Sequence, residues 1–176
     1  HEKIKEAWGL AAVIDYARGD LPGLVLSNLG SLNRALSEKY PQDRLGVTFF
    51  QQDLNYSAYS YERFYDDIVN APNSRIAAKR ILTRWAKDNA RLKATLDQLP
   101  NYGGYFPYFR DFNDSHCTTI VDFRNGDVQE LGLELSDFIS SVLDGSGPVL
   151  DAFEEAQQID KAKPIDWLYV LIGLLL

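Results

Sequence analysis

Apolar side chains recur at helical spacing in the first part of the chain. Between residues 2 and 18 they fall three or four positions apart, and Gly19 followed by Pro22 predicts the end of a first helix. The same spacing between Pro22 and Pro41 predicts a second helix, and the short joint favours an antiparallel pair. The two apolar rows are Ile4, Ala7, Trp8, Ala11, Ile14 and Val25, Leu29, Leu32, Leu36.

The clearest pattern predicts a long helix from residue 74 to about residue 99. Pro72, Asn73 and Ser74 provide a break and a start signal before it. A shorter helix is expected at 59–70, whereas residues 45–54 are too short and too β-branched to distinguish a strand from a helical turn. The apolar row of the long helix is Ala78, Leu82, Trp85, Leu92, Leu96 and Leu99, interrupted by Asn89.

The pattern changes after Pro100. Residues 105–112 are rich in aromatic side chains, which is typical of extended structure. An Asn125-Gly126 turn between two β-branched runs predicts a hairpin at about 118–133. Helices are expected at 136–143 and 149–159. We therefore predict an α+β fold that is mainly helical, with a small antiparallel sheet containing the hairpin, in a single domain covering residues 1–176.

The last segment, residues 165–176, is apolar except for Asp166. It is too short to cross a bilayer, which needs about 20 apolar residues. We expect a terminal helix buried in the core or in a partner. The alternative is a segment that associates with a membrane, either at its surface or as part of a longer span.

Composition limits the classes of site that the chain can hold. Cys117 is the only cysteine, which excludes a disulfide framework and a multi-cysteine metal site, and fits a reducing compartment such as the cytoplasm. The chain has no phosphate-binding loop, no dinucleotide fingerprint and no serine-nucleophile motif. We therefore predict no cofactor and no metal.

Charge is divided along the sequence. The formal net charge is -7, but residues 74–98 carry seven basic and two acidic residues, and residues 110–166 carry thirteen acidic and four basic residues. Spacing by three and four places four of the basic residues on one helix face, opposite the apolar row: Arg80, Arg84, Lys87 and Arg91. This basic stripe is either a solvated face, paired with acids of the same chain, or a contact for an acidic partner. No specific nucleic-acid partner is expected, because the remaining charge repels it.

Two clusters of aromatic residues, at 49–65 and 102–112, are the candidates for a recognition surface. Tyrosine offers large contact area with few rotatable bonds and is enriched at interfaces. The alternative is that these rings pack between the sheet and the helices. The candidate binding residues are Tyr56, Tyr59, Tyr61, Tyr102, Tyr105, Tyr108, Asp111 and Asp114.

Catalytic and metal-binding patterns are weak. His116 and Cys117 are adjacent, and neighbours on a strand point to opposite faces, so we do not expect a nucleophile–base pair. Asp111, Asn113, Ser115 and Asp122 have the spacing of a calcium loop, but His116 replaces the loop glycine.

The sequence therefore favours a protein-binding factor over an enzyme. An inhibitor, immunity protein or adaptor that recognises a basic partner through acidic and tyrosine-rich surfaces fits the charge and the aromatic clusters. The alternatives are an enzyme whose carboxylates and His116 meet only in three dimensions, and the soluble part of a membrane-associated protein.

Overall fold

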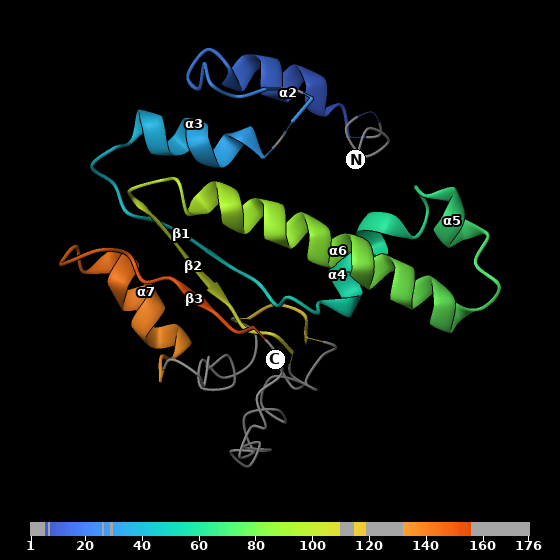
Figure 1. Ribbon diagram of the computed structural model, residues 1–176. Coiled ribbons are helices and arrows are strands. Elements are labelled where there is room, and N and C mark those ends of the chain that lie inside the picture. The colour runs from blue at the N-terminus through green and yellow to red at the C-terminus, as the bar shows by residue number, and fades with distance from the viewer. Residues whose placement is uncertain are drawn as a thin grey trace, which may run out of the picture. The chain divides into compact units, whose positions relative to one another are not determined.

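A computed structural model describes residues 6, 8–25, 27–28, 30–109, 115–118 and 132–155. The chain forms two compact units. Unit 1 comprises His1–Leu45 and Tyr56–Tyr102, and unit 2 comprises Gly46–Asn55 and Gly103–Leu176. The expectation of a single domain stays a prediction. The elements in chain order are α2 (Leu10–Ala17), α3 (Ser31–Lys39), β1 (Leu45–Thr48), α4 (Leu54–Tyr61), α5 (Asp66–Val69), α6 (Ser74–Leu96), β2 (Tyr102–Phe106), α7 (Leu135–Leu143) and β3 (Ala152–Phe153) (Figure 1).

The first two helices of unit 1 share a small apolar cluster. Ile14 of α2 and Ala35 of α3 are buried together with Leu24 from the segment between them. The second predicted helix starts later than its apolar row suggested. Val25 instead pairs with Asn28 in an isolated bridge, and its N–H donates to Ser31 Oγ at 2.8 Å. This local turn explains why α3 begins only at Ser31.

The long helix is confirmed as α6. Its start is fixed by Asn73, whose side chain accepts the N–H of Ile76. Its buried residues are Ile81, Asn89 and Leu96, whereas Ala78, which the apolar row included, is exposed. The buried face is therefore turned slightly from the predicted one.

A second cluster of unit 1 joins α4, α5 and α6. Tyr61, Ile68 and Ile81 are buried there, with Tyr65 and Trp85 packed against them. The predicted helix at 59–70 is in fact two helices, α4 and α5, separated by residues 62–65.

Unit 2 contains a three-stranded sheet in the order β1-β2-β3, and the sheet is parallel. β2 pairs with β3 in parallel, with Tyr105 opposite Ala152 and Phe106 opposite Phe153. Directly beyond β1 and β2, the N–H of Gln51 donates to Pro107 O and the N–H of Gln52 donates to Tyr108 O. The donor and the acceptor both advance by one residue in the same direction, as in parallel neighbours. The prediction of an antiparallel sheet is therefore wrong. The hairpin proposed at 118–133 lies almost wholly outside the described residues.

Close packing explains the two glycines of β2. A side-chain carbon on Gly103 would collide with the carbonyl oxygen of Leu150, and one on Gly104 would collide with the ring of Phe106. All residues of β2 after Tyr102 are buried, as is usual for a strand of a parallel sheet.

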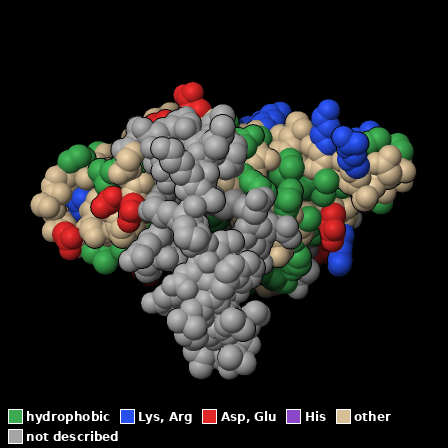
Figure 2. Space-filling model, turned by 90° about the horizontal axis from the view of Figure 1, so that it is seen from below, with side chains coloured by type: hydrophobic (Ala, Val, Ile, Leu, Met, Phe, Trp, Pro, Cys, Tyr) green, Lys and Arg blue, Asp and Glu red, His purple; other side chains and the backbone are tan. Residues whose placement is uncertain are grey.

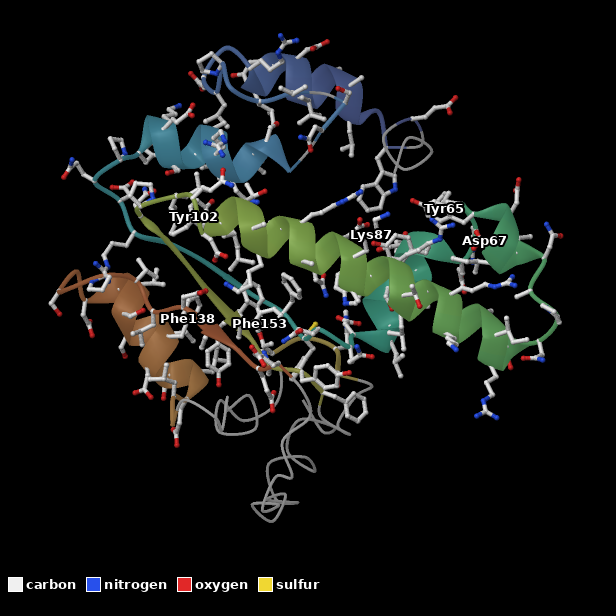
Figure 3. The ribbon with its side chains drawn as sticks, in the orientation of Figure 1. Tyr65, Asp67, Lys87, Tyr102, Phe138 and Phe153 are labelled. Atoms are coloured by element: carbon white, nitrogen blue, oxygen red, sulfur yellow. The ribbon has the colours of Figure 1, made fainter. Side chains whose placement is uncertain are left out.

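Helix α7 covers the sheet from one side and is the helix predicted at 136–143. Phe138, which is labelled in Figure 3, packs on Tyr105, with ring centroids 5.8 Å apart. The same cluster also buries Leu135 and Ala152. The helix predicted at 149–159 is wrong for its described part, because Ala152–Phe153 is strand β3. A short apolar run does not distinguish a helix from a buried strand.

Candidate functional site

Polar residues gather where the three parallel strands of unit 2 end. Gln51 and Asp53 follow β1, Tyr108 follows β2, and Glu154 follows β3. Gln51, Asp53 and Glu154 are all buried. The carboxyl edge of a parallel sheet is where ligands bind in open α/β proteins, because the loops there converge. Buried polar residues at this edge make it the candidate site.

Gln51 ties the three strand ends together. Its side-chain amide donates to Phe106 O at 2.9 Å and to Glu154 O at 2.6 Å, and its backbone N–H donates to Pro107 O. The carboxylate of Glu154, which is fully buried, accepts the N–H of Tyr108 at 2.6 Å. Because both amide hydrogens of Gln51 are used, its position is strongly determined. The site therefore stands on a rigid frame.

His116 is brought to this frame by Asp53. Nδ1 of His116 lies 2.9 Å from Oδ2 of Asp53, and the Asp53 side chain is only 7% exposed while that of His116 is 28% exposed. Thr118 Oγ1 also lies 3.2 Å from Thr48 Oγ1. The segment 115–118 is thus held at two points, against Thr48 at the end of β1 and against Asp53 beyond it.

The backbone on both sides of His116 is unusual. Ser115 and Cys117 have φ angles of 56° and 60°, the only positive values among the non-glycine residues that the structure describes. Side chains disfavour this left-handed region, and such strain concentrates at functional sites. Segment 115–118 is not a strand. The sequence argument that His116 and Cys117 point to opposite faces, and so cannot form a nucleophile–base pair, assumed a strand and does not apply here. Cys117 is a half-buried thiol.

The Asp53–His116 pair can transfer protons. An ionised carboxylate only accepts hydrogen bonds, so Nδ1 of His116 carries the hydrogen when the ring is neutral. Nε2, on the opposite edge of the ring, is then the basic nitrogen. A carboxylate that holds the ring in this way fixes its tautomer and stabilises the imidazolium that forms when Nε2 takes a proton.

The predicted binding tyrosines do not share one environment. In unit 1, Tyr56 and Tyr59 are more than half exposed, Tyr61 is buried, and Tyr102 donates to Asn33 at 3.3 Å. In unit 2, Tyr105 is buried in the core and Tyr108 is half-buried. Asp111 and Asp114 lie outside the described residues.

The structure divides the basic stripe. Arg80 donates to the carbonyl oxygen of Asp67, and Arg84 donates to the Asp67 carboxylate at 2.8 Å. Arg84 also lies 3.9 Å above the ring of Tyr65, the residue that precedes α5. Both arginines therefore contact the start of α5, where Figure 3 labels Tyr65 and Asp67. Lys87 and Arg91 are exposed, and Arg91 lies 3.6 Å from Asp88. Lys and Arg side chains gather over the end of unit 1 that contains α5 (blue in Figure 2).

Neither a metal cluster nor a membrane span is found in the part of the chain that the structure describes. No group of three His, Cys, Asp or Glu residues there has the geometry to hold a metal ion. No described helix is both long and apolar enough to cross a bilayer. The calcium-loop residues Asp111, Asn113 and Asp122, and the apolar segment 165–176, lie outside the described residues.

Sequence reasoning named His116 but missed its partner. Asp53, Gln51 and Glu154 were not candidates, because their burial depends on strands that the sequence left open or assigned to a helix. One signal was present, since polar residues directly follow the β-branched run at 45–50. Comparison with models of known families, with curated proteins and with solved structures finds no match to this chain.

Proposed function

We propose that the chain is an enzyme that uses His116 as a general acid and base, positioned by Asp53. The observation that carries the proposal is the 2.9 Å contact between a partly exposed imidazole and a buried carboxylate. The pair lies at the carboxyl edge of a parallel sheet and is flanked by strained backbone. This is the alternative in the sequence analysis of an enzyme whose carboxylates and His116 meet only in three dimensions.

Hydrolysis of an acyl bond is the simplest reaction for this pair, because it needs only water as a second reactant. Nε2 of His116 takes a proton from water while the water oxygen bonds to the acyl carbon. The protonated ring then gives that proton to the leaving oxygen as the acyl bond breaks, which releases an acid and an alcohol. Asp53 stabilises the imidazolium between the two transfers.

Hydrolysis of p-nitrophenyl acetate tests the base role by itself, since p-nitrophenolate leaves without being protonated. His116→Gln should lower the rate about a hundredfold, and Asp53→Asn should lower it by a similar factor. Asp15→Asn makes the same chemical change on the exposed face of α2 and should leave the rate unchanged. A wild-type rate no higher than that of His116→Gln would contradict the proposal, provided that both proteins have the same circular dichroism spectrum.

A second candidate function, binding of a basic protein, is favoured by the division of charge between the units. Unit 1 has fourteen basic and eleven acidic residues, a formal charge of +3, whereas unit 2 has four basic and fourteen acidic residues, a formal charge of -10. Asp137 in α7 and Asp144, the residue that caps its C-terminal end, are both exposed and lie seven positions apart, which places them on one face. An inhibitor, immunity protein or adaptor would use such a surface to speed association with a basic partner.

Affinity capture at low and moderate salt tests this second function. A partner should be retained by the full chain and lost with the double variant Asp137→Asn/Asp144→Asn, because the variant removes charge from α7 without changing the Asp53–His116 pair. Retention of the same proteins by both forms would show that this acidic face is not the binding surface.

A further inference from the structure

Unit 2, which holds the Asp53–His116 pair, is acidic, with a formal charge of -10. The described residues of unit 2 include seven carboxylates and no Lys or Arg. Four of these carboxylates are exposed and one, Glu154, is fully buried beside Gln51. Lys and Arg are the usual groups that hold a phosphate or a carboxylate. The formal charge of unit 2 as a whole therefore favours a cationic substrate over an anionic one. The seven are Asp53, Glu134, Asp137, Asp144, Asp151, Glu154 and Glu155.

Three phenylalanine rings lie at the same strand ends. Phe49 directly follows β1, and Phe106 and Phe153 are the last residues of β2 and β3. The ring centroids of Phe49 and Phe106 are 4.8 Å apart, and those of Phe106 and Phe153 are 6.2 Å apart. Phe106 is buried, whereas Phe49 and Phe153 are half-buried and keep part of their surface accessible. Aromatic faces attract cations, most of all weakly hydrated ones such as quaternary ammonium groups.

We infer that this site takes a substrate bearing an organic cation, of the alkylammonium class. The inference rests on the proposed acid–base function and names its substrate. The negative charge of unit 2 raises the local concentration of a cation, and the phenylalanine rings give its alkyl groups an apolar contact. The acyl group lies at Nε2 of His116, which handles the proton as described above.

Two esters that differ only in charge provide the test. Acetylcholine carries a trimethylammonium group, and 3,3-dimethylbutyl acetate carries an uncharged group of the same shape. At low salt, kcat/KM for the cationic ester should exceed that for the neutral ester by about tenfold, and added salt should reduce the ratio. Phe153→Leu should lower the ratio, because it keeps an apolar side chain but removes the aromatic face.

Binding of the two alcohols separates this inference from the proposed function. Choline should bind the His116→Gln variant more tightly than 3,3-dimethylbutanol does, as measured by NMR titration, and Phe153→Leu should remove the difference. Equal hydrolysis of both esters, or equal binding of both alcohols, would overturn the cationic substrate and leave the acid–base role standing. Hydrolysis of neither ester together with selective choline binding would overturn the acid–base role alone.

Discussion

Tyr61 donates its phenolic hydrogen to Asp88, with Oη and Oδ2 2.5 Å apart, across two helices of unit 1. The ring of Tyr61 is buried in the cluster that joins α4, α5 and α6. A hydrogen bond to a charged group contributes about 1.5–3 kcal/mol to stability, more than one between neutral groups. The contact therefore ties α4 to α6 by both packing and polarity.

Replacing Tyr61 by phenylalanine should lower the free energy of unfolding by about 1–2 kcal/mol, because the ring stays but the hydroxyl is lost. Urea unfolding near neutral pH measures the effect. Tyr59→Phe is the matched control, since Tyr59 lies on the same helix and is more than half exposed. If the two variants lost equal stability, the hydrogen bond to Asp88 would not be the cause.

High pH should destabilise the protein through the same tyrosine. Burial, and then the hydrogen bond and charge of Asp88, raise the pKa of Tyr61 well above its ordinary value; burial also raises the pKa of Tyr102. A raised pKa means that the folded state keeps a proton that the unfolded state releases. The stability from Tyr61 is therefore complete below about pH 10 and falls as pH rises above that value.

The measurement is the urea midpoint below and above the pKa of an unfolded tyrosine. The wild-type protein should lose more stability over this interval than Tyr61→Phe, which has no phenol to ionise at that position. A decline of the same size in both proteins would show that other groups dominate the alkaline transition.

Sequence patterns predicted some elements and not others for identifiable reasons. Helix α6 was predictable because its signals are local: the Asn73 cap, then regular apolar spacing over many turns. The sheet was not, because β3 has two residues, Ala152 and Phe153, and gains its identity only by pairing with β2. The Asp53–His116 contact joins residues 63 positions apart, so no spacing rule brings them together. The basic stripe divided because α5 places Asp67 beside only its first two members.

Replacing Gln51 by leucine should destabilise unit 2 by about 1–3 kcal/mol, because buried carbonyl groups lose their donor. Phe106 O still accepts the N–H of Glu154 at 3.2 Å, so the larger loss is expected at Glu154 O. Gln52→Leu is the matched control, since Gln52 is the chain neighbour and is only half-buried. Chemical denaturation measures the free energy of unfolding, and exchange of the Glu154 backbone N–H measures the local loss of stability. Equal losses of stability in the two variants would contradict the role of Gln51 in joining the strand ends.

The division of the basic stripe predicts unequal effects of removing its members. Arg84 pairs with Asp67 and lies over Tyr65, whereas Lys87 is exposed on the next turn of α6. The Arg84 and Asp67 side chains are 37% and 48% exposed, so solvent weakens their ion pair to well under about 1 kcal/mol. With the ring contact included, Arg84→Ala should cost about 1 kcal/mol and Lys87→Ala close to nothing.

Arg84→Lys separates charge from shape at the same position. Lysine keeps the positive charge but lacks the planar group that lies on the Tyr65 ring, so this variant should recover only part of the lost stability. Thermal unfolding at low and high salt separates the contribution of the ion pair from that of the ring contact. Salt screens the ion pair but leaves the ring contact largely unchanged. If Arg84→Lys were as stable as the wild type at both salt concentrations, the Tyr65 contact would contribute nothing, and the two halves of the stripe would differ only in charge pairing.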